Sequence, residues 1–273
     1  MNRLYHVDAF TEVPFKGNPA AVCIIEDDHS DQWMLQVAAE MNLSETAFIR
    51  KQPDGYGLKW FTPKKEVSLC GHATLATAHI LWEEGLINPA EGIELHTLSG
   101  KLTANRNGKV IILDFPSRKV SPTGNNNSIN QSIGDDPIFT NKFITENGTI
   151  YLLEYGDEEI VRGLHPNFNE LLKTDARSVI VTSRSNSNEY DFISRYFAPA
   201  VGINEDPVTG SSHCCLAPYW AEKLGKVVLT GYQASLRGGF VQCKHMGNRV
   251  QIGGKAVTIS KGELIVEKYR TRE

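Results

Sequence analysis

Two long apolar segments dominate the pattern of hydrophobic and polar positions along the chain. Residues 73–84 are apolar on almost every side, and residues 212–224 form a second such segment with Pro218 inside it. A helix that is apolar all round is normally buried all round, and an internal proline indicates a kink or a late start. Gly85 and Gly225 follow the two segments and suit the C-terminal ends of helices. The pattern therefore predicts two buried central helices.

Short β-branched segments separated by glycine turns accompany both predicted helices. Examples are residues 110–113, 227–229 and 257–259, and such segments are typical of strands. Because a fully buried helix needs cover, we expect these strands to supply it. The prediction is an α+β fold of two similar half-domains, each a curved mixed β-sheet or barrel wrapped around one central helix, with the active site between them. A further amphipathic helix is expected at residues 31–41, with Ser30 as its N-cap.

The sequence repeats itself in the same order at nearly one offset, which indicates an internal duplication. From Gly71 to Gly210 the offset is 139 residues, and from Val110 to Val250 it is 140. The matching segments are 61–63 with 197–199, 70–73 with 209–212, 99–102 with 237–240, and 107–110 with 247–250.

The duplication sets the expected domain organisation. We place the half-domains at residues 1–118 and 119–273, with the polar stretch 124–128 as a loop or linker. A last strand is expected at residues 263–269, and the sequence leaves open whether it returns to the first half.

Composition excludes several classes of function. Of the 273 residues, 41% are hydrophobic and 22% charged, as in globular proteins. The formal net charge is −4 and no run of Lys or Arg is present, so we expect no nucleic-acid partner. No apolar run is long enough to cross a bilayer, and the first ten residues lack an apolar secretion signal. Five cysteines without a CxxC pair indicate free thiols in a reducing compartment, so we expect a cytoplasmic protein without membrane contact.

A tight glycine turn precedes each predicted central helix. These turns are residues 70–72 and 209–212. The start of a helix exposes unpaired backbone N–H groups and the positive end of the dipole, so it can bind an anion. Two such turns directed at one cleft would hold a carboxylate or a developing enolate from two sides. Ordinary helix caps would carry the same glycines.

Three residues near these turns are candidates for acid–base chemistry. Glu45 lies in a polar island between a predicted helix and an apolar stretch, where partial desolvation would raise its pKa toward neutrality. Asp206 directly precedes the second glycine turn, and His72 lies inside the first, where a neutral imidazole can relay protons. Each also suits a structural role, as a surface glutamate, a capping aspartate or a local hydrogen-bonding histidine.

No metal site is expected from the spacing of the ligand-type residues. The run 213–215 is His-Cys-Cys, but consecutive residues on a helix do not face one another. His72 and His79 have useful helical spacing and lack a third ligand. Cys70 precedes a helix and suits either a reactive thiolate or a packed free cysteine.

Four motifs spread over nearly the whole chain carry a family resemblance. The chain resembles the PhzF family, the phenazine biosynthesis-like proteins, which are related in fold to diaminopimelate epimerase and proline racemase. The motifs are HVDAFT (6–11) with FKGNPA (15–20), LSETAF (43–48), EVSLCGHAT (66–74) and EDPVTGSSH (205–213).

The resemblance implies a wrapped-helix fold, a homodimer, a small carboxylated substrate and no cofactor or metal. It also implies isomerisation of a dihydro-hydroxyanthranilic acid, in which a proton moves around a conjugated ring. By the same resemblance Glu45 shuttles the proton, and His72 and Asp206 assist. The residues implied to bind substrate are Asn18, Ser44, Gly71, Gly210, Ser211 and Ser212.

The chain departs from the racemases of this fold at one position. Those enzymes use two cysteines, one in each half, as bases on opposite faces of a carbon. This chain has Cys70 at the first position and Thr209, a far weaker acid, at the second. The sequence therefore favours a proton-shift isomerase over an amino-acid racemase or epimerase. A non-catalytic ligand-binding protein of the same fold is the third alternative.

Overall fold

The computed structural model describes residues 2–266, which fold into two compact units. The first comprises the chain up to Asp114 together with the segment from Gly253 onward, and the second comprises Phe115–Ile252. The described residues from Gly253 to Val266 therefore group with the first unit, which is the alternative that the sequence left open beside the expected division into residues 1–118 and 119–273. Residues 267–269 of the expected last strand lie outside the described part of the chain.

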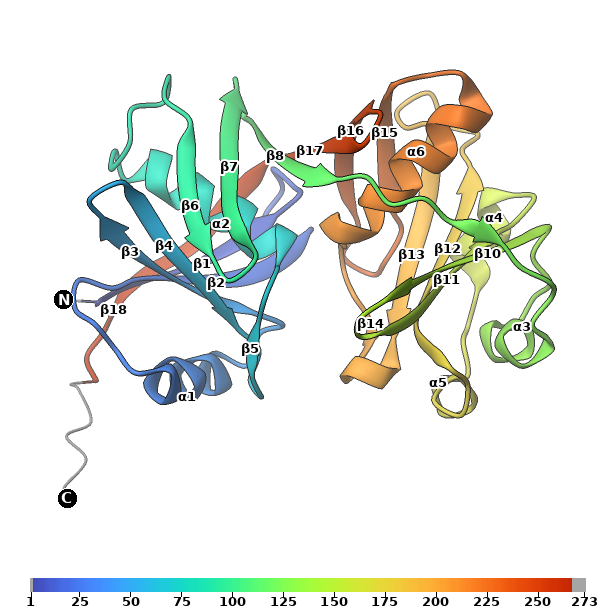
Figure 1. Cartoon of the computed structure of the whole chain (residues 1–273), viewed down its shortest axis with the longest axis horizontal. Coiled ribbons are helices and arrows are strands. Elements are labelled where there is room, and N and C mark those ends of the chain that lie inside the picture. The colour runs from blue at the N-terminus through green and yellow to red at the C-terminus, as the bar shows by residue number, and fades with distance from the viewer. Residues whose placement is uncertain (1, 267–273) are drawn as a thin grey trace. The chain divides into compact units, whose positions relative to one another are not determined.

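The first unit is built from strands and two helices (Figure 1). Its elements are β1 (Asn2–Ala9), β2 (Asn18–Ile24), α1 (Asp31–Met41), β3 (Thr46–Gln52), β4 (Gly55–Phe61), β5 (Glu66–Val67), α2 (Gly71–Glu83), β6 (Ile93–Thr97), β7 (Gly100–Asn107), β8 (Val110–Pro116) and β18 (Ala256–Leu264).

The sheet of the first unit runs in the order β18-β1-β2-β3-β4-β6-β7-β8. The short β5 pairs with the end of β4. Two pairs, β2 with β3 and β4 with β6, are parallel, and the others are antiparallel. Parallel neighbours require a crossover connection, usually a helix. Here α1 makes the first crossover and α2 the second.

The second unit contains the following elements: β9 (Ser121–Pro122), α3 (Asn127–Ile133), β10 (Phe139–Thr145), β11 (Gly148–Glu154), α4 (Glu158–Gly163), α5 (Phe168–Leu171), β12 (Ala176–Arg184), β13 (Phe192–Ala198), η1 (Pro199–Val201), β14 (Ile203–Glu205), η2 (Gly210–Ser212), α6 (His213–Leu224), β15 (Val228–Gln233), β16 (Gly239–Met246) and β17 (Arg249–Gly254).

The second unit repeats the pairing scheme of the first. The order β9-β10-β11-β12-β13-β15-β16 has parallel pairs at β11 with β12 and at β13 with β15, and β14 pairs with the end of β13. Helices α4 and α5 make the first crossover and α6 makes the second. The two units differ in one neighbour. On the side away from β11, β10 pairs with β9, which precedes it in sequence. On the side away from β2, β1 pairs with β18, near the end of the chain. This repeated ladder agrees with the repeat in the sequence.

Helix α2 is the core of the first unit. All of its residues except His79 and Glu83 are buried, and it packs against β1, β2, β3 and β18. A helix buried on all sides needs strands on several sides, so the sheet must curve around it. In the second unit α6 packs against β15 and β16 and contains Pro218. Gly225 ends α6 in the left-handed conformation, as its position in the sequence predicted.

The remaining helices fix local details of both units. The hydroxyl of Ser30 accepts the backbone N–H of Trp33 at 3.2 Å, so Ser30 caps α1 as predicted. Asn126 caps α3 in the same way, and that helix begins inside the stretch 124–128, which the sequence suggested as a loop. The difference arises because an asparagine cap followed by Ile129 and Ile133 on one face suffices to start a short buried helix.

Candidate functional site

The start of α2 places two ionisable side chains together. Cys70 is the N-cap residue in extended conformation, and its side chain makes no capping hydrogen bond. Its carbonyl accepts the backbone N–H of Thr74 at 3.1 Å and also the Thr74 hydroxyl. The first N–H groups of such a helix have no partner within the helix. The turn therefore presents backbone donors beside Cys70 and His72.

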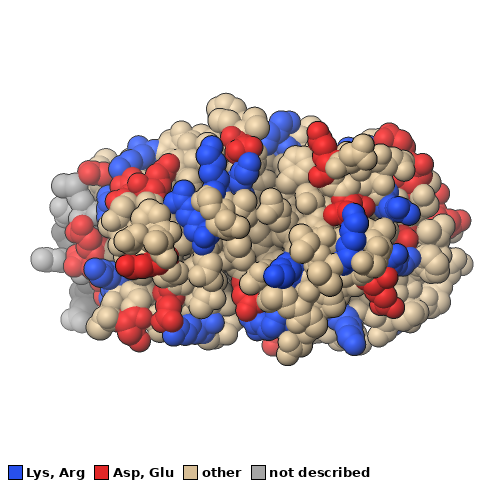
Figure 2. Space-filling model, turned by 90° about the horizontal axis from the view of Figure 1, so that it is seen from above, with Lys and Arg blue, Asp and Glu red and all other residues tan. Residues whose placement is uncertain are grey.

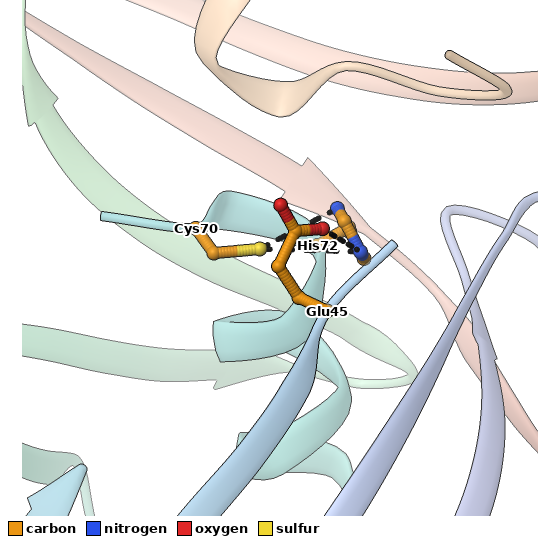
Figure 3. Close-up of side chains that lie close together, drawn as sticks. All are labelled: Glu45, Cys70 and His72. Carbon is orange, nitrogen blue, oxygen red and sulfur yellow. Dashed lines mark hydrogen bonds and ion pairs between the residues drawn. The ribbon is translucent and has the colours of Figure 1, made fainter. Parts of the chain in front are cut away.

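Glu45 reaches this turn from a different part of the sheet. Helix α1 ends at Met41, and Asn42 takes the left-handed conformation that turns the chain toward β3. Glu45 directly precedes β3, and its carbonyl accepts the N–H of Ala21 in β2 at 3.4 Å. Pairing with β2 thus holds the backbone of Glu45, and its side chain extends to the start of α2. Figure 3 shows the side chains of Glu45, Cys70 and His72 pointing toward one another.

His72 lies at the centre of the cluster. Its Nε2 is 3.3 Å from Oε2 of Glu45, and its Nδ1 is 3.3 Å from the side-chain amide nitrogen of Asn18. The sulfur of Cys70 is 3.6 Å from Nδ1 and 3.9 Å from Nε2. Asn18, the first residue of β2, is fully buried. The side chain of Glu45 is 17% exposed and that of His72 7%, so Glu45 is the more accessible of the pair.

A carboxylate, an imidazole and a thiol thus form one cluster in the first unit. A carboxylate paired with an imidazole can take a proton from a bound molecule and return it. The neighbouring N–H groups at the helix start can stabilise negative charge that develops on that molecule. Of the residues predicted from the sequence, the structure brings together Asn18, Glu45, Gly71 and His72, with Ser44 next to Glu45 in the chain.

The corresponding turn in the second unit has a different chemistry. The hydroxyl of Thr209 donates to Oδ2 of Asp206, and the backbone N–H of Thr209 donates to Oε1 of Gln233 at 2.8 Å. The amide nitrogen of Gln233 donates to the carbonyl of Asp206 at 2.7 Å and lies 3.2 Å from the Thr209 hydroxyl. Ser212 donates to the carbonyl of Thr209 at 2.8 Å. The carboxylate of Asp206 thus accepts a side-chain hydroxyl at the turn before α6.

Gln233 is the member of this network that sequence reasoning missed. It is completely buried at the end of β15, 24 residues after Thr209. Its only signal in the sequence is a polar residue closing a strand, which is too common to select it. Gly210 and Ser212 are buried at this turn, whereas Ser211 is exposed.

The run 213–215 does not form a metal site among the described residues. His213 is fully buried, burial lowers its pKa to about 4, and its Nδ1 is 2.9 Å from the carbonyl of Thr209. Burial raises the pKa of the Cys214 thiol to about 12 and raises that of Cys215 as well. Such groups stay neutral at ordinary pH, which suits packing.

Other surface features are separate from the cluster. A pocket of about 320 Å³ lies at the C-terminal end of α2, lined by His79, Glu83, Arg106 and Lys109 among others. On the face drawn in Figure 2, basic and acidic side chains are interspersed and form no continuous basic stripe. Among residues 2–266, no helix is both long and apolar enough to span a bilayer.

Comparison with known proteins gives consistent matches over nearly the full length. The profile of the phenazine biosynthesis-like protein family, PhzC-PhzF, matches residues 7–262. An uncharacterized isomerase of Halalkalibacterium halodurans is 52% identical, over 96% of this chain and 98% of that one. The crystal structure of a PhzF-family protein from Enterococcus faecalis is 40% identical with a TM-score of 0.90, covering 97% of this chain and 99% of that one.

The fold alone extends further. A probable proline racemase from Agrobacterium radiobacter superposes with a TM-score of 0.63 at 11% identity, covering 99% of this chain and 95% of that one. The mixed α+β architecture is thus shared with the epimerase and racemase structures. On the family match and the two close relatives, the chain belongs to the phenazine biosynthesis-like (PhzC-PhzF) protein family.

Proposed function

We propose that this protein is an isomerase that moves a proton on a small carboxylated, unsaturated or cyclic metabolite, without a cofactor. The observation that carries the proposal is the Glu45–His72 pair, 3.3 Å between Oε2 and Nε2, at the start of the buried helix α2. Relatives of this family at high identity are named isomerases.

The reaction needs one base that both removes and returns the proton. The Glu45 carboxylate takes a proton from a carbon next to the conjugated system, and the electron pair of that C–H bond spreads into the system and the substrate carboxylate. Protonated Glu45 then gives the proton to a different carbon of the same system, which shifts the double bond. Proton transfer by a positioned side chain contributes about 10²–10⁴-fold to such a rate.

His72 acts in this scheme through Glu45. Its imidazole fixes the carboxylate on one side and is itself held by Asn18 on the other. The backbone N–H groups at the turn around Gly71 stabilise the charge on the substrate carboxylate. We also propose that Asp206, Gly210, Ser211 and Ser212, at the turn before α6, bind substrate.

A single-base reaction is favoured by the state of Thr209. A two-base racemase needs a second acid of suitable strength, and the Thr209 hydroxyl donates instead to Asp206. Racemisation is the second candidate because the Cys70 sulfur lies 3.6 Å from the His72 ring. Exchange of the α-proton of amino acids in deuterated water would support racemisation.

The first experiment is incubation of the protein with dihydro-hydroxyanthranilic acid in deuterated water, followed by NMR. We expect product formation, with turnover reduced about 10³-fold in Glu45→Gln. Glu12→Gln is the matched control, because Glu12 pairs with Lys255 at 2.7 Å on the surface. A fully active Glu45→Gln enzyme would refute the role of Glu45. If this compound does not react, a panel of amino and hydroxy acids is tested in the same way. Absence of any reaction with the panel favours a non-catalytic binding protein.

The expected homodimer and cytoplasmic location remain proposals. Light scattering on the purified protein tests the first, and cell fractionation tests the second.

A further inference from the structure

The Glu45–Cys70–His72 cluster offers three different metal-ligand atoms at one point. One carboxylate oxygen, the thiol sulfur and one ring nitrogen lie within 4.8 Å of one another. The three side chains converge from the start of α2 and from the residue before β3 (Figure 3). The sequence did not predict this group, because Glu45 is 25 residues from Cys70 and no short-range spacing joins them.

The distances in the cluster resemble the edges of a tetrahedral zinc site. Zinc bonds of about 2.3 Å to sulfur and about 2.1 Å to nitrogen or oxygen give tetrahedral edges of about 3.4 Å between nitrogen and oxygen and about 3.6 Å between sulfur and nitrogen. The observed Nε2–Oε2 distance is 3.3 Å, and the Sγ–Nε2 distance is 3.9 Å. Of the three edges, the first therefore already fits and the second needs a contraction of about 0.3 Å, while the third, between sulfur and carboxylate oxygen, lies within 4.8 Å.

We propose that Glu45, Cys70 and His72 form a binding site for a zinc ion, with its fourth position open to water or a substrate oxygen. A thiolate and an imidazole select a borderline-soft cation such as Zn²⁺ over Mg²⁺ or Ca²⁺. A carboxylate and a thiolate together balance the two positive charges of the ion. The dipole of α2 favours the anionic forms of groups at its start.

Asn18 is the side chain that would support His72 as a metal ligand. A metal-bound histidine usually donates its other ring N–H to an acceptor, which fixes the ring orientation. The buried side-chain amide of Asn18 lies against Nδ1 of His72. In this structure the amide nitrogen faces Nδ1. Zinc binding through Nε2 would therefore require the amide to turn, so that its oxygen accepts the Nδ1–H and the lone pair of Nε2 is free for the metal.

Zinc at this site would inhibit the isomerase. This consequence depends on the proposed function, because it assumes that Glu45 carries the proton. A carboxylate oxygen bound to zinc cannot take that proton. Zinc binding also displaces the thiol proton. Zinc affinity should therefore fall about tenfold for each unit by which the pH is lowered, as long as the thiol of the metal-free protein is protonated.

Zinc binding is tested directly by titrating the purified full-length protein with zinc alone against a chromophoric chelator. We expect one equivalent per chain, and affinity at least about 100-fold lower in Cys70→Ser, since even loss of a supporting residue commonly costs 10–100-fold. Cobalt(II) in place of zinc should give a thiolate-to-metal charge-transfer band that Cys70→Ser removes.

His79→Gln is the matched control. His79 and Glu83 form another histidine–glutamate pair, with 3.6 Å between Nε2 and Oε2, at the other end of α2. This variant should keep the zinc affinity of the wild type. Circular dichroism checks that Cys70→Ser remains folded. Unchanged affinity in folded Cys70→Ser, or absence of the cobalt band from the wild type, would overturn the proposal.

The inhibition arm separates the two proposals. Zinc at one equivalent should abolish turnover, and a chelator should restore it. If zinc binds stoichiometrically and turnover stays complete, zinc is not an inhibitor, and a residue other than Glu45 transfers the proton. If no substrate is turned over, only the proposed function suffers, because the titration and the cobalt spectrum still decide the metal site.

Discussion

Helices α2 and α6 begin at equivalent points of the repeated fold, but the side chains around their first residues differ. In the first unit, the turn before α2 carries Cys70 and His72, with Glu45 beside them. In the second unit, the turn before α6 carries Thr209, whose hydroxyl and N–H are engaged by Asp206 and Gln233. The first turn gathers a thiol, an imidazole and a carboxylate, whereas in the second the hydroxyl and N–H of Thr209 are taken up by hydrogen bonds within the turn's own network.

The contrast shows how a duplicated fold can separate two tasks. The pairing scheme of strands and crossovers is the same in both units, so the backbone framework is not what distinguishes them. A few side chains around each glycine turn make the difference. We therefore interpret the first turn as the reactive one and the second as a rigid structural and binding element.

Removing the imidazole from the first turn should have the largest effect. In His72→Gln, an amide can still contact Glu45 but cannot hold a proton, so we expect kcat to fall about 10²–10³-fold with KM little changed. Steady-state kinetics on wild type, His72→Gln and His79→Gln check this, and the last variant should behave as wild type. If thermal unfolding shows that His72→Gln loses activity only because it is partly unfolded at the assay temperature, His72 has a structural role.

Opening the network in the second turn should affect stability more than chemistry. Gln233→Met keeps the volume but leaves the buried N–H of Thr209 and the half-buried carbonyl of Asp206 without this partner. Loss of a hydrogen-bond partner costs about 1–3 kcal/mol for each buried group. We therefore expect the free energy of unfolding to fall by about 3 kcal/mol. Urea denaturation measures it. Gln242→Met on the exposed side of β16 should change stability by less than about 0.5 kcal/mol. Equal effects of the two variants would contradict the closed network.

The repeated framework could be predicted from the sequence because the repeat consists of short motifs of neighbouring residues. Long segments that are apolar on almost every side indicated α2 and α6, and the serine before Asp31 indicated the cap of α1. The sequence did not assign the last strand, because β18 pairs with β1 from 247 to 262 residues away and no local signal indicates that partner. Pairing of that range is decided by tertiary packing.

The candidate site was predicted as a set of residues, and its geometry was not. The motifs singled out Glu45 and His72, but their contact depends on the registers of β2 and β3, which only the fold reveals. Cys70 was left between a reactive and a packed role, and the structure adds its contact with His72. Gln233 stayed unpredicted because its partners are distant in sequence.

The smallest expected effect concerns His213, the histidine that follows the second glycine turn. His213 is fully buried and its pKa is lowered to about 4 by burial, below the ordinary value of 6.5. The unfolded chain therefore binds one more proton than the folded chain between these values, so stability is present above pH 6.5 and is lost as pH falls toward 4. The loss between pH 7 and pH 5 should be about 2 kcal/mol. In His213→Asn, whose amide can still donate to the Thr209 carbonyl, this part of the pH dependence should vanish. Urea denaturation of both proteins at several pH values measures the difference, and parallel curves would show that His213 does not titrate in this way.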